Sequence, residues 1–306
     1  MIEVKELTKK YGDKIGIENV TFKVEKGEIL GFLGPNGAGK TTTMRIITGF
    51  LAPTSGSANV CGYDVSENPI EVKRRTGYLP EHPPLYLDMS VYSYLEFVAK
   101  IKGVNKKDRK RAIDEVIEKC GLKDVRGRLI KNLSKGFRQR VGIAQAIVHN
   151  PEVLVLDEPT LGLDPQQIME IRNFIKNLKG QHTIILSTHI LPEVTMVCSR
   201  VIIINKGRLV AEDALEDLYR KEREKLIISL RIEGEKEAVL RLLKPLKGVQ
   251  SVESRNGEFL VECSKGYDPR DEIVKTILSA GMKLMEMKEN LPTLEEIYIK
   301  RISQEG

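Results

Sequence analysis

The chain has 306 residues, of which 41% are hydrophobic and 30% charged, and it carries a net charge of +6. This length suits two domains, and the composition suits a globular protein with a buried core. No stretch approaches the ~18–20 apolar residues of a membrane-spanning helix, the first residues lack the apolar core of a signal peptide, and the charge excess is too moderate to indicate a nucleic-acid-binding protein.

The first part of the chain is predicted to alternate strands and helices. Residues 2–7 and 20–24 alternate apolar and polar side chains as half-buried strands do, and 28–33 is an apolar run typical of a buried strand. Helical periodicity is expected over three segments: 40–50, 90–118 with a break near 103–105, and the stretch from Ser134 to Pro151.

Further apolar strands and a helix follow along the chain. Buried strands are expected at 153–156, 183–186 and 201–204, with a helix over 166–178 and a short strand through 209–210. Apolar strands that alternate with helices are typical of a parallel sheet covered on both faces. We therefore predict an α/β domain over residues 1–218, with a helical subdomain at about 88–150.

The pattern changes after about residue 218. The charged run 221–225 is interpreted as a helix end or a linker, and a βαββαβ order follows it. The expected strands are 226–232, 249–254, 258–263 and 283–288, and the expected helices are 235–246, 269–280 and a closing one at 292–302. With Asn256-Gly257 as a hairpin turn, this order predicts a small ferredoxin-like α+β domain over 219–306.

A glycine-rich loop joins the strand at 28–33 to the next helix and matches GxxxxGK[ST]. Its glycines let backbone N–H groups turn toward phosphates, Lys40 adds a positive charge, and Thr41 offers a hydroxyl to Mg²⁺. The flanking strand and helix disfavour the alternative of a chance glycine-rich turn. The residues predicted to hold the phosphates of ATP or GTP are Gly34, Pro35, Asn36, Gly37, Ala38, Gly39, Lys40, Thr41 and Thr42.

Two acids follow the buried strand at 153–156. Asp157 and Glu158 should lie at the carboxyl edge of the sheet, where the glycine-rich loop also ends. Asp157 there suits Mg²⁺ coordination through water, and Glu158 suits polarising an attacking water. An acidic pair after a strand is otherwise a common helix cap, but its pairing with the loop favours catalysis.

The order of these motifs resembles the ATP-binding subunits of ABC transporters, over roughly residues 1–215. Residues 132–140, with sequence NLSKGFRQR, look like the signature of that family. The resemblance implies that Ser134 and Gly136 of one subunit, with Lys135 and Phe137 beside them, contact ATP held by a second subunit. Lys135 stands where the family usually has the first glycine, and Phe137 stands where the place of the glutamine begins.

Other positions carry over from the family one at a time. Tyr11 matches the aromatic residue that stacks on adenine, and His189 matches the switch histidine that contacts the γ-phosphate. Leu161–Asp164 resembles the loop that crosses the dimer interface, with Asp164 as its acid. Without the resemblance, Tyr11 would as readily be a surface residue and His189 a structural one.

Glu81 stands where most family members have a glutamine that touches Mg²⁺ and the water. A glutamate in the segment Gly77–Glu81 resembles the ABC-2 exporters, which include drug, polysaccharide, lipid and gliding-motility systems. Residues 82–100 occupy the region that docks the membrane partner in the family. The segment Pro292–Ile299 also resembles the helix that closes many ABC-2 ATPases.

The resemblance implies an ABC-type ATPase that binds ATP and Mg²⁺, pairs with a second copy or a homologous subunit, and powers a separate membrane permease. It implies a cytoplasmic protein on the inner face of the cell membrane, and four scattered cysteines suit that reducing compartment. A soluble ABC ATPase acting on ribosomes or DNA is the alternative, but it needs two ATPase halves or a coiled-coil insertion between Thr42 and Ser134. A scaffold without turnover is disfavoured by Glu158 and His189.

Overall fold

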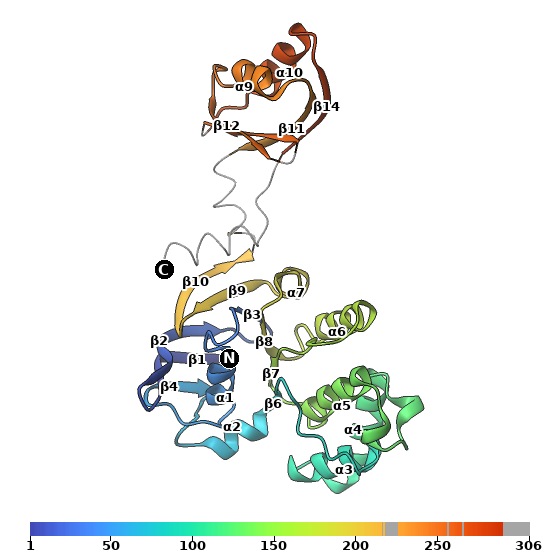
Figure 1. The fold of residues 1–306 in the computed structure, drawn as a ribbon. Coiled ribbons are helices and arrows are strands. Elements are labelled where there is room, and N and C mark those ends of the chain that lie inside the picture. Colours follow the sequence, from blue (N-terminus) through green and yellow to red (C-terminus); the bar gives the residue numbers. More distant parts are fainter. Residues whose placement is uncertain (216, 218–225, 256, 265, 290–306) are drawn as a thin grey trace. The chain divides into compact units, whose positions relative to one another are not determined.

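The computed structural model describes residues 1–215, 217, 226–255, 257–264 and 266–289. They form two compact units, shown in Figure 1. The first is Met1–Leu215, and the described strands and helices of the second run from Ile227 to Glu289. None of the described helices combines the length and the apolar character that crossing a bilayer requires.

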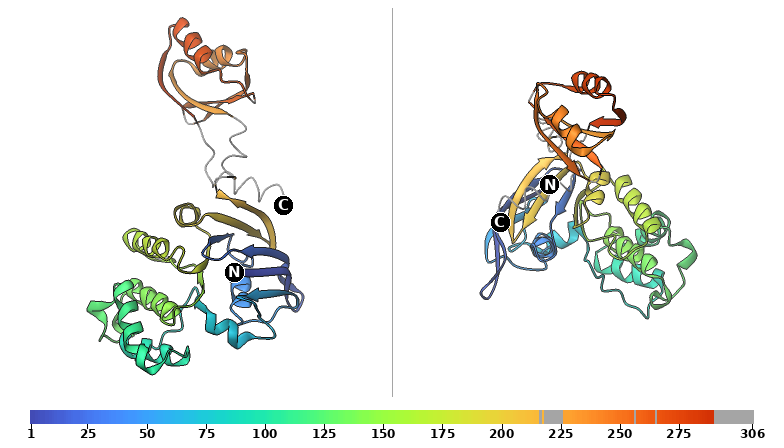
Figure 2. Two further views of the ribbon diagram at one scale, coloured as in Figure 1. Left: turned by 180° about the vertical axis from the view of Figure 1, so that it is seen from behind. Right: turned by 45° about the horizontal axis from the view of Figure 1, so that its top comes forward.

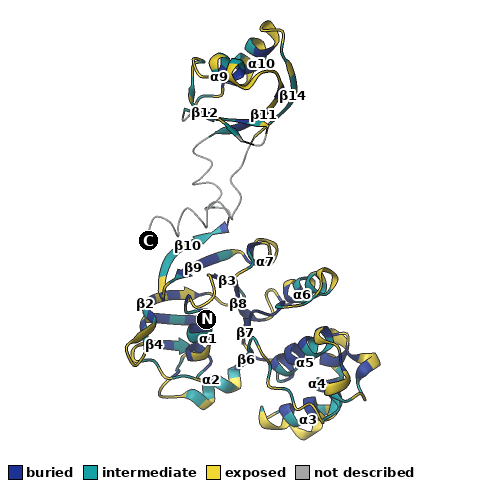
Figure 3. Ribbon diagram, in the orientation of Figure 1, coloured by how far each residue is buried: buried dark blue, intermediate teal, exposed yellow. Residues whose placement is uncertain are grey.

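A six-stranded sheet forms the centre of the first unit, in the order β10-β9-β3-β8-β7-β6. Five strands are parallel, and β10 pairs antiparallel with β9. The strands are β3 (Ile29–Leu33), β6 (Thr76–Leu79), β7 (Val153–Asp157), β8 (Thr183–Thr188), β9 (Arg200–Asn205) and β10 (Arg208–Ala214). Every residue of β3, β7 and β8 is buried, which confirms the parallel sheet expected from their apolar runs (Figure 3).

An antiparallel sheet of order β2-β1-β4-β5 packs beside the central one. Its strands are β1 (Ile2–Tyr11), β2 (Lys14–Val24), β4 (Ser55–Val60) and β5 (Tyr63–Asp64). The two sheets share one core with helix α1 (Lys40–Ile47), which contributes the buried Met44 and Ile46. The rings of Phe22 and Phe32, one from each sheet, have centroids 5.5 Å apart. This shared core fixes the position of the loop that enters α1.

Some helices cover the faces of the central sheet, and others form a separate group. They are α2 (Pro69–Arg75), α3 (Val91–Ile101), α4 (Lys106–Lys119), α5 (Lys135–Ile147), α6 (Pro165–Asn177) and α7 (Leu191–Val197). Helices α3, α4 and α5 lie together, away from β1, β2 and β4, in all the views of Figures 1 and 2. Gly103, with φ of +79°, separates α3 from α4 at the predicted break. Helix α5 runs so close to β6 that Gly77 has no room for a side chain against Ala146.

The second unit has the ferredoxin-like strand order that the sequence predicts. Its sheet has the order β12-β13-β11-β14 with antiparallel neighbours. The elements are β11 (Ile227–Glu233), α9 (Lys236–Leu243), β12 (Val249–Arg255), β13 (Glu258–Cys263), α10 (Arg270–Ser279) and β14 (Lys283–Glu289). The charged run 221–225, Asn256 and the closing helix at 292–302 lie outside the described residues.

Several short elements were not predicted from the sequence. Strands β4 and β5, helix α2 and strand β6 fill the interval between 55 and 79, and α7 follows β8. Strand β4 has the sequence SGSANV, in which only Ala58 and Val60 are buried, so it lacks an apolar alternation. Helices α2 and α7 have only seven residues each, too few to reveal a helical period.

Candidate nucleotide-binding site

The glycine-rich loop begins where β3 ends and turns directly into α1. Gly37 and Gly39 have φ of +78° and +109°, a region that favours glycine. A Cβ atom at Gly39 would lie 2.6 Å from the side chain of Ile17 and 2.8 Å from the carbonyl oxygen of Gly16. The close approach of β2 therefore requires glycine at this position. The loop delivers the first backbone N–H groups of α1, which suit an anion, into an open cavity.

Lys40 is the first residue of α1, and its side chain is only 6% exposed. Its Nζ donates hydrogen bonds to the carbonyl oxygens of Gly34, at 2.8 Å, and Pro35, at 3.3 Å. Nζ also lies 3.2 Å from Oε1 of Glu158, in ion-pair rather than hydrogen-bond geometry. The ammonium group is thus held at the mouth of the loop, where phosphate oxygens can take the place of these acceptors.

Asp157 ends β7 and is fully buried. One of its carboxylate oxygens accepts a hydrogen bond from the hydroxyl of Ser187 on β8, while Oδ2 has no hydrogen-bond partner among the described residues. Burial raises the pKa of Asp157, the hydrogen bond from Ser187 and the nearby hydroxyl of Thr41 lower it, and the charges of Glu158 and Glu81 raise it further. An unpaired buried oxygen beside other carboxylates and a threonine hydroxyl fits a divalent cation.

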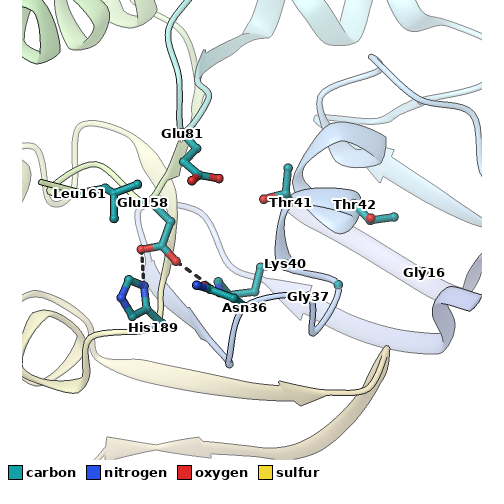
Figure 4. Close-up of a pocket in the computed structure, with 11 residues that line it drawn as sticks. Gly16, Asn36, Gly37, Lys40, Thr41, Thr42, Glu81, Glu158, Leu161 and His189 are labelled. Atoms are coloured by element: carbon teal, nitrogen blue, oxygen red, sulfur yellow. Dashed lines mark hydrogen bonds and ion pairs between the residues drawn. The ribbon is translucent and has the colours of Figure 1, made fainter.

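Glu158 sits between Lys40 and His189 (Figure 4). Its Oε2 lies 2.9 Å from Nδ1 of His189, and the side chain is 6% exposed. The backbone of Glu158 has φ of +49°, an uncommon conformation for a residue with a side chain, and its N–H donates to the carbonyl oxygen of Ser187. This strained turn places the carboxylate on the cavity wall.

A cavity of about 400 Å³ is the space that these groups surround, a size that suits a small-molecule ligand. Nine of the predicted residues line it: Asn36, Gly37, Gly39, Lys40, Thr41, Thr42, Glu81, Glu158 and His189. Gly16 and Leu161 line it as well. Gly16 was missed because it belongs to no motif in the sequence, and Leu161 was expected only as part of the loop at the dimer interface. Asp157 is fully buried and does not itself line the cavity. Among the described residues, no group of three or more His, Cys, Asp or Glu side chains is placed so that it could hold a metal ion.

Tyr11 ends β1 beside the glycine-rich loop and is 48% exposed. Its hydroxyl lies 3.4 Å from Oγ1 of Thr42, and its ring lies over Gly16, where a Cβ atom would come within 2.8 Å of it. An exposed ring at the edge of the cavity is available to stack on a flat ligand group.

Other predicted residues lie apart from this cavity. Ser134, Gly136, Phe137 and Asp164 line a second pocket of about 300 Å³, together with Arg140, Gln166, Gln167 and Glu170. Ser134 accepts a hydrogen bond from the N–H of Phe137 at the start of α5, and Asp164 accepts one from Gln167 at the start of α6. The amino group of Lys135 lies against Gly162. One chain therefore carries the glycine-rich loop and the signature in two different pockets.

A glycine-rich loop that opens a helix, next to acids at the carboxyl edge of a parallel sheet, defines the class of P-loop nucleotide-binding proteins. The family is given by comparison with known proteins. The profile described as ABC transporter matches residues 17–161. The chain belongs to the ABC transporter family, as an ATP-binding protein and ATPase.

Relatives of similar length support this assignment. The bacitracin transport ATP-binding protein BcrA of Bacillus licheniformis is 34% identical, over 99% of this chain and 97% of its own. The linearmycin resistance ATP-binding protein LnrL of Bacillus subtilis (strain 168) is 31% identical, over 98% and 97%. Among solved structures, the dimeric structure of MJ0796, a bacterial ABC transporter cassette, has a TM-score of 0.65 and 25% identity, over 70% of this chain and 99% of that one.

Proposed function

We propose that the chain is the ATP-hydrolysing subunit of an ABC exporter, in which two ATPase subunits drive a separate membrane permease. The observation that carries this proposal is the position of Glu158, held between Lys40 and His189 on the wall of the phosphate-loop cavity. A carboxylate at this place suits a general base for water, and a site that only binds nucleotide has no need of it.

The charged groups of the site and their neighbours have distinct roles in this proposal. Lys40 and the N–H groups of the loop bind the phosphates, and Tyr11 supports the adenine. Thr41 and Asp157 would hold Mg²⁺, which neutralises phosphate charge when it is bound, with Glu81 facing the same space. Glu158 takes a proton from the attacking water, and His189 orients Glu158 and contacts the terminal phosphate.

A second subunit completes each site. The exposed Ser134 and the start of α5 lie in a pocket separate from the loop, so they are free to approach ATP bound to another copy. Asp164 lines the same pocket. The dimeric cassette described above supports a pair of ATPase subunits, formed by two copies or by a copy and a homologue.

The names of the relatives and Glu81 support export of a drug-like cargo through a permease. The permease would dock on the surface of residues 82–100, where Tyr86 and Leu87 are exposed. The ring of Tyr86 lies 6.0 Å from that of Tyr94 and 5.3 Å from that of Phe97. Tyr94 is buried and Phe97 half-buried, so they support the exposed ring of Tyr86 from below. An exposed aromatic ring held in this way suits contact with a partner helix, and such docking holds the ATPase on the cytoplasmic face of the membrane.

Reversing charges beside these aromatic rings is expected to uncouple the ATPase from its permease. Glu96 and Lys100 form an exposed pair on α3, with 3.7 Å between their charged groups. In the double variant Glu96→Lys/Lys100→Glu the internal pair is kept but each charge presented to the partner is reversed. Basal hydrolysis should stay within about twofold of the wild type, because an exposed pair contributes little to stability, while stimulation of ATPase activity by permease-containing vesicles is lost.

The matched control swaps Glu237 and Arg241, an exposed pair with the same spacing and a 3.7 Å separation on α9. It should leave both activities unchanged. Full stimulation of the α3 variant would contradict docking on this surface, and loss of its basal hydrolysis would show a role within the ATPase itself.

A further inference from the structure

One buried carboxylate outside the cavity joins the two loops that carry Glu158 and His189. Glu193 lies on α7 and is 1% exposed. The hydroxyl of Thr160 donates a hydrogen bond to its Oε1, and the hydroxyl of Thr188 donates one to its Oε2 at 2.7 Å. Thr188 is close to Glu193 in sequence but Thr160 lies far before it, so Glu193 joins the two threonines only in the folded chain.

Each threonine lies next to a residue of the cavity. Thr160 stands two residues after Glu158 and directly before Leu161, which lines the cavity. Thr188 directly precedes His189, and its Oγ1 also accepts a hydrogen bond from the N–H of Ile190, at 3.0 Å. The hydroxyl of Thr188 is therefore bonded both to Glu193 and to the backbone just after His189, so it helps to fix the backbone that carries the imidazole.

A cation from a fourth element accompanies the carboxylate. Nη2 of Arg172, on α6, lies 3.7 Å from Oε1 of Glu193. A buried carboxylate without hydrogen bonds or a counter-charge is strongly destabilising, and here two hydroxyls and a guanidinium supply both. Since a well-packed apolar side chain can fill such a place at no loss of stability, packing alone does not account for a charged group here.

The segment that Thr160 begins runs from one pocket to the other. Leu161 lines the nucleotide cavity, and Asp164 lines the second pocket and caps α6, the helix that carries Arg172. The carboxylate of Glu193 therefore touches the start of this segment through Thr160 and the helix after it through Arg172.

We propose that Glu193 is a positioning residue for ATP hydrolysis. By binding Thr160 and Thr188 together it fixes Glu158 relative to His189, whose side chains lie 2.9 Å apart. A partner subunit that presses on the second pocket moves the segment to Asp164, and Glu193 transmits that movement to His189. This inference rests on the roles proposed above for Glu158 and His189.

The test separates positioning from packing by changing one hydroxyl. Thr188→Ser keeps the hydroxyl that bonds to Glu193 and to the N–H of Ile190, and Thr188→Val keeps the shape but removes both bonds. We expect kcat for ATP to fall ~10- to 100-fold in Thr188→Val and in Glu193→Gln, because small misplacements of catalytic groups cost this much. KM and the affinity for a fluorescent ATP analogue should stay within about twofold, and Thr188→Ser should restore most of kcat.

Glu28→Gln is the matched control. Glu28 is a largely buried carboxylate that pairs with Arg200 at 2.7 Å, at the end of β3 opposite the glycine-rich loop. It should lower the melting temperature without a selective loss of kcat. The proposal is overturned if Thr188→Val equals Thr188→Ser in kcat, or if Thr188→Val and Glu193→Gln, like Glu28→Gln, lower the melting temperature without a selective loss of kcat.

The Thr188 pair gives the answer even where Glu193→Gln does not fold. Glu158→Gln, measured in parallel, separates this inference from the function beneath it. If Glu158→Gln is inactive and the two Thr188 variants are equal, only the positioning role fails. If Glu158→Gln hydrolyses ATP at the wild-type rate, the roles proposed for Glu158 and His189 fail first.

Discussion

Glu158→Gln is expected to bind ATP with close to wild-type affinity and to hydrolyse it ~10²- to 10⁴-fold more slowly, the range that a general base contributes. Glutamine keeps the shape of the side chain but does not accept a proton from water. The phosphate-binding groups are unchanged: the N–H groups of the loop, Lys40 and Thr41. Release of the ion pair with Glu158 leaves Lys40 freer to contact phosphate, so binding should not weaken.

Phosphate release at saturating ATP measures the loss, and a fluorescent ATP analogue measures the binding that remains. Because ATP is bound but not consumed, the variant should also accumulate as a nucleotide-bound dimer in size-exclusion chromatography. Glu152→Gln is the control, since Glu152 is exposed and directly precedes the first residue of β7, at the end of the strand away from Glu158. Hydrolysis by Glu158→Gln at the wild-type rate would refute the role given to this carboxylate.

Lys40→Met is expected to lose ATP binding, and hydrolysis with it. The substitution keeps the buried aliphatic stem and removes only the ammonium group, which lies at the mouth of the loop and bonds to the carbonyl oxygens of Gly34 and Pro35. A hydrogen bond to a charged group contributes ~1.5–3 kcal/mol, so two lost contacts with phosphate correspond to a ~100-fold or greater loss of affinity.

Equilibrium binding of a fluorescent ATP analogue checks this prediction, with the melting temperature of the nucleotide-free protein recorded beside it. Lys176→Met, at the exposed end of α6, is the matched control and should bind as the wild type does. Affinity unchanged in Lys40→Met would mean that the ammonium group does not contact phosphate.

Local patterns in the sequence predicted much of the fold. Strands β3, β7 and β8 could be predicted from their apolar runs, because parallel strands that are buried on both faces consist largely of apolar residues. The described strands and helices of the second unit could be predicted from the spacing of their apolar residues. Strand β4 and helix α7 were not, because β4 buries only two side chains and α7 is shorter than two helical periods plus its caps.

The candidate site divides in the same way. The glycine-rich loop and the acids after β7 are contiguous in sequence, so their spacing predicts their chemistry. The contact that joins Thr160 to Thr188 through Glu193 depends on how α7 packs against the end of β8 and the loop after β7, and no motif in the sequence predicts it. Gly16 lies on the cavity for the same reason: tertiary packing, and not a motif, brings it there.

The central claim is that each ATP site is built from the loop of one subunit and the signature of another. Two variants with one defect each address it. Lys40→Met disables phosphate binding by the loop and leaves the signature intact. Ser134→Asp keeps the loop and, because aspartate is a good helix cap, keeps the start of α5, but its charge repels a terminal phosphate.

Each variant alone is expected to be inactive, since both sites of its homodimer carry one defect. In a mixed dimer, one site joins the intact loop of Ser134→Asp to the intact signature of Lys40→Met. The decisive measurement is therefore the rate of phosphate release when the two inactive variants are mixed. The account predicts hydrolysis well above the sum of the separate rates, and a rate equal to that sum would contradict a site shared between subunits.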